Sequence, residues 1–106
     1  MAHAGRFRIA SSFVERLCGL LRRRLCRNGE TLLLMPCSRI HTFGMGEAID
    51  VAFVSPYGRV LLATRSLPPN RLLSCREAVG TLERRADCNA DWYETGELIH
   101  LVSVGK

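Results

Sequence analysis

The sequence predicts an α+β domain, with a mostly antiparallel or mixed, barrel-like β-sheet, one main N-terminal helix and a short C-terminal helix. Three observations support this prediction. Short apolar runs bounded by turn residues recur from residue 31 onward, a Pro-Tyr-Gly turn joins two of them, and one segment near the N-terminus has apolar residues at helical spacing. A chain of 106 residues fits a single domain over residues 1–106.

The N-terminal segment predicts one strand followed by the main helix. Residues 6–10 alternate polar and apolar side chains, as a half-buried strand does. Ser12 and Glu15 have the spacing of a capping box, which marks the start of a helix. We expect this helix over residues 13–24, before the turn pair Asn28-Gly29, with an apolar stripe made of Phe13, Leu17, Leu20, Leu21 and Leu25.

The central segment predicts a buried strand and a β-hairpin. Residues 31–35 are a short apolar run that Pro36 ends, and residues 49–54 form a second such run. The residues from Ser55 to Gly58 have turn chemistry, with proline and glycine where a β-turn favours them. Because residues 59–64 then return as a strand, we expect a hairpin at this point.

Four further segments are expected in the C-terminal part of the chain. The Leu-Pro-Pro-Asn sequence of residues 67–70 predicts a rigid, extended surface segment. Residues 78–83 predict a strand in which Gly80 marks a bulge or a close contact. Residues 89–94 predict a short helix, and residues 98–102 predict the last strand.

Composition and cysteine usage favour a cytoplasmic protein. Apolar residues make up 47% of the chain and charged residues 24%, which is ordinary for a soluble domain. No apolar run approaches the ~18 residues that span a bilayer, and the N-terminal residues lack the apolar centre of a signal peptide. An odd cysteine count without a Cys-x-x-Cys pair favours free thiols at Cys18, Cys26, Cys37, Cys75 and Cys88. We expect a monomer without a cofactor.

The arginines raise the question of nucleic-acid binding. The net charge is +5, from fourteen arginines and one lysine against ten acidic residues. Five of the arginines lie in the predicted helix or just after it: Arg16, Arg22, Arg23, Arg24 and Arg27. No aromatic residues that could stack on bases alternate with them. We therefore favour a solvated helix end whose cations stabilise the helix dipole, and nucleic-acid binding is the least favoured function.

The residues from Cys37 to Asp50 carry the groups with reactive chemistry. Cys37 and His41 are spaced so that a thiol could be activated by an imidazole, with Asp50 orienting the ring. Alternatively, Cys37, His41 and Cys75, with Asp50 or His100, could hold Zn²⁺. Cys37 and Cys75 could also form a disulfide in an oxidising compartment. We favour a structural interpretation, in which Cys37 is buried and His41 bonds to the backbone.

Other polar and apolar groups near this stretch receive structural interpretations as well. Met45 could line a pocket, but core packing is favoured. Asp50 lies inside an apolar strand, where its charge is costly unless backbone N–H groups or an arginine satisfy it. We expect it to accept hydrogen bonds from the loop of residues 44–48. Glu83 is expected to pair with Arg22 or Arg23.

Eight motifs occur in a consistent order along residues 8–102: Gly19-Leu-Leu-Arg-Arg23, His41-Thr-Phe-Gly-Met45, Ile49-Asp50, Gly58-Arg-Val60, Leu67-Pro-Pro69, Cys75, Leu82-Glu83 and Gly96-Glu97. Together they resemble the domain of unknown function 192, a family of small bacterial and archaeal proteins, in its His-Thr-Phe-Gly-Met branch. The resemblance implies a small α+β, partly barrel-like fold and brings no established activity.

The chain departs from the family pattern at three places. Gly46-Glu47-Ala48 stands where the family commonly has Arg-Phe-Pro, so a cation, a ring and a proline are missing. The aspartate of the hairpin turn is replaced around Ser55-Pro56, and Arg84-Arg85-Ala86 replaces Pro-Ala-Gly. A family ligand that depends on the Arg-Phe-Pro segment would be lost in this chain.

The leading hypothesis is a non-enzymatic module that binds a small ligand or a partner protein. Its expected site is the mouth of the loop from Cys37 to Asp50, with the Leu67-Pro-Pro segment nearby. The candidate pocket residues are Cys37, His41, Thr42, Met45, Asp50 and Cys75. The alternative is a thiol and imidazole enzyme or a zinc site built on Cys37, His41, Asp50 and Cys75.

Overall fold

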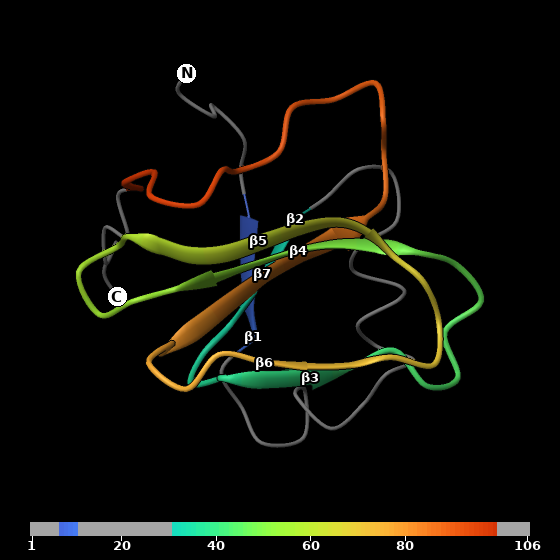
Figure 1. The fold of residues 1–106 in the computed structure, drawn as a ribbon, viewed down its shortest axis with the longest axis horizontal. Helices are drawn as coiled ribbons and strands as arrows, with labels where there is room; N and C mark the ends of the chain where they lie inside the picture. The colour runs from blue at the N-terminus through green and yellow to red at the C-terminus, as the bar shows by residue number, and fades with distance from the viewer. Residues whose placement is uncertain (1–6, 11–30, 100–106) are drawn as a thin grey trace.

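The computed structural model describes residues 7–10 and 31–99, which form seven β-strands in two sheets. The larger sheet has five strands in the order β1-β2-β7-β4-β5, and the smaller sheet pairs β3 with β6 (Figure 1). The strands are β1 (Phe7–Ala10), β2 (Thr31–Leu34), β3 (Arg39–His41), β4 (Ile49–Val54), β5 (Val60–Leu67), β6 (Leu72–Ser74) and β7 (Gly80–Arg85).

The larger sheet is mixed, as expected. β1 pairs with β2 in parallel, and the pairs β2–β7, β7–β4 and β4–β5 are antiparallel. The predicted β4–β5 hairpin is confirmed: Gly58 N–H donates to the Ser55 carbonyl at 3.0 Å, and Gly58 has a φ of 83°, which favours glycine. Gly80 marks a close contact, because a Cβ there would lie 2.8 Å from Met35 Cγ.

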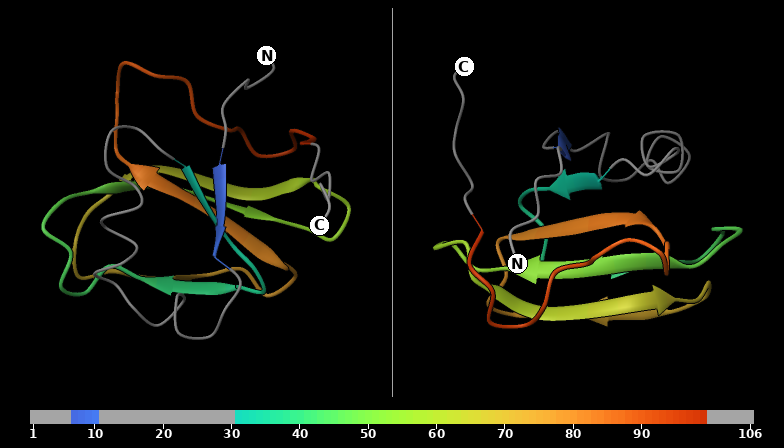
Figure 2. Two further views of the ribbon diagram at one scale, coloured as in Figure 1. Left: turned by 180° about the vertical axis from the view of Figure 1, so that it is seen from behind. Right: turned by 90° about the horizontal axis from the view of Figure 1, so that it is seen from above.

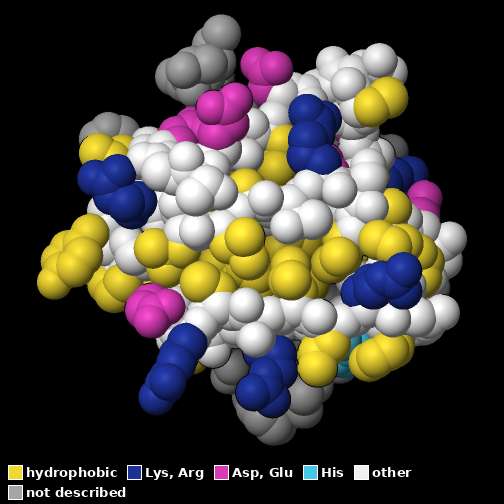
Figure 3. All heavy atoms as spheres, viewed as in Figure 1, with side chains coloured by type: hydrophobic (Ala, Val, Ile, Leu, Met, Phe, Trp, Pro, Cys, Tyr) yellow, Lys and Arg dark blue, Asp and Glu magenta, His cyan; other side chains and the backbone are white. Residues whose placement is uncertain are grey.

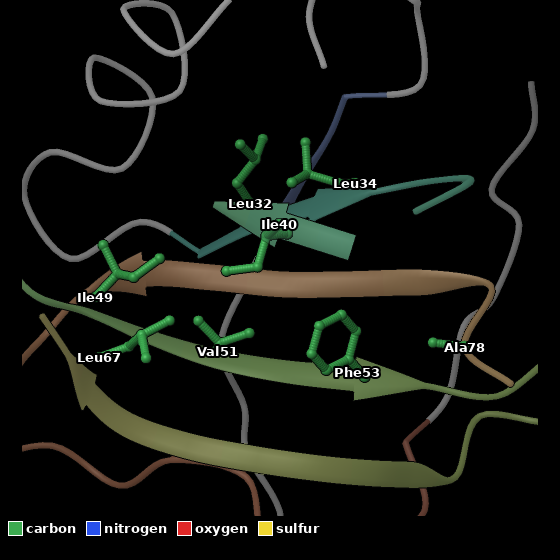
Figure 4. Close-up of a cluster of buried hydrophobic side chains, with 8 residues drawn as sticks. All are labelled: Leu32, Leu34, Ile40, Ile49, Val51, Phe53, Leu67 and Ala78. Atoms are coloured by element: carbon green, nitrogen blue, oxygen red, sulfur yellow. The ribbon is translucent and has the colours of Figure 1, made fainter. Parts of the chain in front are cut away.

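Alternation along β4 divides the buried side chains into two clusters, one on each face of the larger sheet. The first cluster lies between the two sheets and contains Leu32, Leu34, Ile40, Ile49, Val51, Phe53, Leu67 and Ala78 (Figure 4). The second lies on the opposite face and contains Leu33, Ala52, Val54, Val60, Leu82, Trp92 and Tyr93. The segment after β7 crosses over this second face and covers it (Figure 2).

The predicted α+β class is wrong for the part of the chain that the structure describes, which is all-β. The helix expected over residues 89–94 is absent for a physical reason. Arg65 and Arg84 side chains bind the Ala90 carbonyl at 2.6 and 3.2 Å, so it is not left to a helical N–H. The N–H of Glu94, which a helix would direct to that carbonyl, donates to Glu97 Oε1 at 3.0 Å instead. This segment is therefore irregular, and it packs Trp92 and Tyr93 against the second cluster.

Other elements also differ from the predictions. The sheet is not closed into a barrel, since β1 and β5 end its strand order. β3 and β6, of three residues each, were not predicted. The strand expected at residues 78–83 starts at Gly80, because Ala78 N–H closes a turn on the Cys75 carbonyl.

Two expected elements fall on other parts of the chain. The helix over residues 13–24 lies outside the described residues, as do residues 100–102 of the last strand. Within the described part of that strand, Leu98 forms a single bridge to Arg59. No helix within residues 7–10 and 31–99 is long and apolar enough to cross a membrane.

Candidate functional site

The six candidate residues from the sequence lie in three different surroundings. Cys37, Met45 and Cys75 pack against the first core cluster, between the sheets. Side chains alternate along β4, so the side chain of Asp50 lies on the same face as those of Ala52 and Val54, which is opposite to the first core cluster. His41 is exposed on β3, and Thr42 is buried at the end of that strand.

Thr42 connects β3 to the Leu-Pro-Pro segment. Its hydroxyl donates to the Pro68 carbonyl and accepts from the Arg71 N–H, both at 2.8 Å. Its backbone adds two bonds, from Thr42 N–H to the Arg71 carbonyl at 2.9 Å and from Asn70 N–H to the Thr42 carbonyl at 3.1 Å. Because these groups are committed to the protein itself, Thr42 positions the segment rather than contacting a ligand.

Asp50 is a fully buried carboxylate that is satisfied by three donors. It accepts from Ser66 N–H at 2.9 Å, from Arg84 Nε at 2.9 Å and from Asp87 N–H at 3.3 Å. The prediction that backbone N–H groups or an arginine satisfy it is confirmed, but these groups do not come from the loop of residues 44–48. Arg84 also stacks on Trp92, with Cζ 4.7 Å from the ring centroid.

His41 lies on the outer face of the smaller sheet, away from the two sulfurs. It is directly opposite Leu72 in the β3–β6 ladder, and its ring stacks on Phe43 with the centroids 5.4 Å apart. The side chain of Ile40 points the other way, into the first core cluster. The structure therefore separates His41 and Asp50 from the thiols.

This separation bears on the alternative chemistries. Among the described residues, no three His, Cys, Asp or Glu side chains lie close enough together to hold a metal ion. His100, a further candidate ligand, lies outside them. Cys37 and Cys75 are free thiols, and Cys37 Sγ donates to the Arg39 carbonyl at 3.2 Å. Glu83 is fully buried in β7, and its expected partners Arg22 and Arg23 also lie outside the described residues.

Cys37, Met45 and Cys75, which pack against the first core cluster, are part of a larger apolar surface. Partly buried hydrophobic side chains extend the first core cluster toward solvent, and we call them the apolar band: Cys37, Met45, Leu61, Leu62, Leu73 and Cys75. On the face that carries β5 and β6, Figure 3 shows a continuous strip of hydrophobic side chains between the levels of these strands. The core therefore reaches the surface where the two sheets leave one side open.

Sequence reasoning missed the three leucines of this band. The signal was the doubled leucine, at Leu61-Leu62 and again at Leu72-Leu73. Adjacent side chains of a regular strand point to opposite faces, so a doubled leucine indicates either a bulge or an apolar side chain facing solvent. Both occur here, because the β4–β5 register shifts next to Leu61 and Leu72 is 62% exposed.

Basic and acidic residues are unevenly distributed around the band. On the β3–β6 side the exposed charged residues are Arg39, Arg71, Arg76 and Glu77. Acidic residues are concentrated instead in the segment after β7, at Asp87, Asp91, Glu94 and Glu97. In that segment, burial and then the nearby Glu97 carboxylate raise the pKa of Tyr93, and Arg84 partly opposes the shift.

The family model of DUF192, described as an uncharacterized ACR, matches residues 1–98. The chain belongs to the DUF192 family. No curated protein matches the sequence.

The fold of this DUF192 chain is similar to a crystal structure of a protein of unknown function from Novosphingobium aromaticivorans. The TM-score is 0.63 at 19% sequence identity, and the match covers 77% of this chain. The matched part spans 64% of the length of that protein. At this identity the likeness shows the fold alone.

Proposed function

We propose that this DUF192 chain is a non-enzymatic binding module, and that the apolar band receives an apolar ligand or an apolar segment of a partner protein. The proposal rests on one observation, which is the open side of the molecule where the first core cluster reaches solvent. Burial of apolar surface is favourable by about 25 cal/mol per Å², so a partner that covers these side chains gains free energy.

The composition of the band supports binding rather than catalysis. Its side chains are aliphatic or contain sulfur, and the described residues place neither His41 nor Asp50 beside them. The unbranched side chain of Met45 adapts to ligands of different shapes. The nearby cations Arg71 and Arg76 would favour a ligand that also carries negative charge.

A matched pair of leucines in β6 tests the proposal. Leu73 belongs to the band, whereas the adjacent Leu72 is exposed on the outer face of the same strand. The probe is anilinonaphthalene sulfonate, an apolar anion whose fluorescence increases in apolar surroundings. We expect saturable binding to the native protein, weakened about tenfold by Leu73→Ser, which removes roughly 1.4 kcal/mol of contact, and little changed by Leu72→Ser.

The two substitutions also separate binding from stability. Urea denaturation of each variant shows whether the protein remains folded under the titration conditions. If the folded native protein does not bind the probe, or if both serine variants bind it as the native protein does, the band is not a binding site.

A further inference from the structure

We propose that the outer edge of β5 accepts an extended segment of a partner protein as an additional β-strand, and that this segment has an apolar centre flanked by acidic residues. The inference rests on the proposed function, because the apolar band would hold the side chains of the same segment. In addition, the partner segment is recognised through its main chain, and this segment is negatively charged.

The backbone of β5 has an open side. β5 ends the strand order of the larger sheet, with β4 as its neighbour. At its start, Val60 N–H donates outward to the Glu97 carbonyl at 2.8 Å, and Gly96 N–H donates to the Val60 carbonyl at 2.7 Å. Beyond Val60, no backbone partner lies along this outer edge among the described residues. An unpaired edge of this kind is a template for strand addition.

The alternation of hydrogen bonds identifies the backbone groups that point outward. Ser55 N–H donates to the Arg59 carbonyl at 2.9 Å. The backbone groups of Arg59 therefore point toward β4, and those of Val60 point away from it. Leu61 is the extra residue of a register shift, and Leu62 is opposite Phe53. The N–H and C=O of Ala63 therefore point away from the sheet, toward the position of an added strand.

The available edge is short and regular. Leu62, Ala63 and Thr64 pair in unbroken register with Phe53, Ala52 and Val51, and register shifts lie on both sides of this stretch. An added strand would therefore gain only a few main-chain hydrogen bonds. Most of the binding free energy would come from apolar side chains placed on the band, between β5 and β6 (Figures 1 and 3).

The charges near the band select the flanking residues of the partner. Arg71 precedes β6 and Arg76 follows it, so a cation stands beyond each end of this strand. Asp50 pairs with Arg84 and Glu47 pairs with Arg85, so these two carboxylates do not neutralise Arg71 or Arg76. Acidic residues on both sides of an apolar centre would therefore be complementary.

A synthetic peptide with the sequence Glu-Glu-Val-Thr-Ile-Thr-Val-Glu-Glu, blocked at both ends, tests the inference by fluorescence anisotropy. Two further peptides carry N-methyl groups either on the three apolar residues or on the two threonines. In an added strand only one of these sets directs its N–H groups to β5. We expect one methylated peptide to bind about tenfold more weakly than the other, because each lost hydrogen bond costs roughly 0.5–1.5 kcal/mol.

Each outcome has a separate meaning. Equal binding of the two methylated peptides would overturn strand addition while leaving the apolar band as a binding site. Absence of binding by all peptides, with anilinonaphthalene sulfonate still bound, overturns this inference alone, whereas absence of both overturns the proposed function as well. If a peptide with lysine in place of every glutamate binds equally well, the acidic requirement is overturned.

A substitution in the protein provides an independent measurement. Ala63→Pro removes an outward N–H, and proline is tolerated on edge strands where the N–H faces solvent. Ala63→Ser keeps the N–H and is the matched control. We expect weaker binding of the unmethylated peptide by the proline variant and unchanged binding by the serine variant, and equal binding by both would contradict the inference. If the proline variant does not fold, the methylated peptides decide the question.

Discussion

Asp50 and Arg84 lie directly opposite each other on β4 and β7 and form a buried ion pair, with Arg84 Nε donating to Asp50 Oδ2 at 2.9 Å. The same carboxylate binds the N–H groups of Ser66 and Asp87, so it joins the irregular end of β5 to the segment that follows β7. Ser66 has a φ of 55°, a conformation that few non-glycine residues adopt, and its bond to Asp50 holds it there.

Removal of the Asp50 charge should strongly destabilise the fold. Asp50→Asn keeps the size of the side chain but leaves the buried Arg84 guanidinium without a counter-charge. Breaking a buried pair in this way costs about 3–5 kcal/mol. The free energy of unfolding in urea measures the loss, followed by the fluorescence of Trp92, the single tryptophan of the chain.

Glu47 provides the matched control for this prediction. It pairs with Arg85 at 2.8 Å, but both side chains are about half exposed, at 51% and 46%. Exposed pairs contribute little, so Glu47→Gln should change the free energy of unfolding by less than about 1 kcal/mol. Equal losses in the two variants would show that the Asp50 pair is not the main connection between β4, β7 and the following segment.

The hydroxyl of Thr42 should be required to hold the Leu-Pro-Pro segment. Thr42→Val keeps the shape of the side chain but removes its bonds to the Pro68 carbonyl and the Arg71 N–H. Leaving these partly buried groups without their partner should cost about 1 kcal/mol. Thr42→Ser retains the hydroxyl and should lose less, and thermal unfolding of the two variants compares them. A smaller loss for valine than for serine would contradict this role.

The sequence predicted those elements of the fold whose signals are local. Continuous apolar runs and turn residues located the β4–β5 hairpin, and the bounds of β4 agree with the predicted run. β3 and β6 have three residues each, too few for a period of two to become visible. The helix predicted over residues 89–94 does not form because Arg65, 22 and 25 residues away, binds the carbonyls of Asp87 and Ala90 together with the nearby Arg84.

The candidate site shows the same limit. The sequence indicated that Asp50 needs donors, but those donors are 16, 34 and 37 residues away. Cys37, Met45 and Cys75 all pack against the first core cluster, because Cys37 precedes β3, Met45 follows it, and Cys75 follows its partner strand β6. Whether His41 faces the core or solvent depends on the register with β6, which local patterns do not reveal.

Tyr93 should make the stability of the protein fall at alkaline pH. Its pKa in the folded protein is raised above the ordinary value of 10.0, mainly by burial. Between these two pKa values the unfolded chain binds fewer protons than the folded protein, so the free energy of unfolding decreases as pH rises. Below pH 10.0 the neutral phenol is present in both states and this effect vanishes.

Phenolate absorbance can test this prediction because the chain has only two tyrosines, and one substitution leaves Tyr93 alone. Tyr57 is 89% exposed and Tyr93 9%. In Tyr57→Phe, the remaining phenol titration should be that of Tyr93, with a midpoint above the ordinary value of 10.0. Tyr93→Phe should also reduce the fall of stability with pH. A midpoint at or below 10.0 in Tyr57→Phe would contradict a raised pKa at Tyr93.

The cysteines allow the apolar band to be mapped without substitutions. Cys37 and Cys75 belong to the band and are partly buried, whereas Cys88 is exposed in the segment after β7. Bound anilinonaphthalene sulfonate should therefore slow the alkylation of Cys37 and Cys75 by iodoacetamide and leave the rate at Cys88 unchanged. Peptide mass spectrometry gives the rate at each cysteine separately.

Because alkylation requires the thiolate and access to it, Cys88 in the same sample corrects for any effect of the probe on the reagent. Equal slowing at all three sites would indicate a change in the whole protein, and slowing at Cys88 alone would place the probe on the opposite, acidic side of the larger sheet.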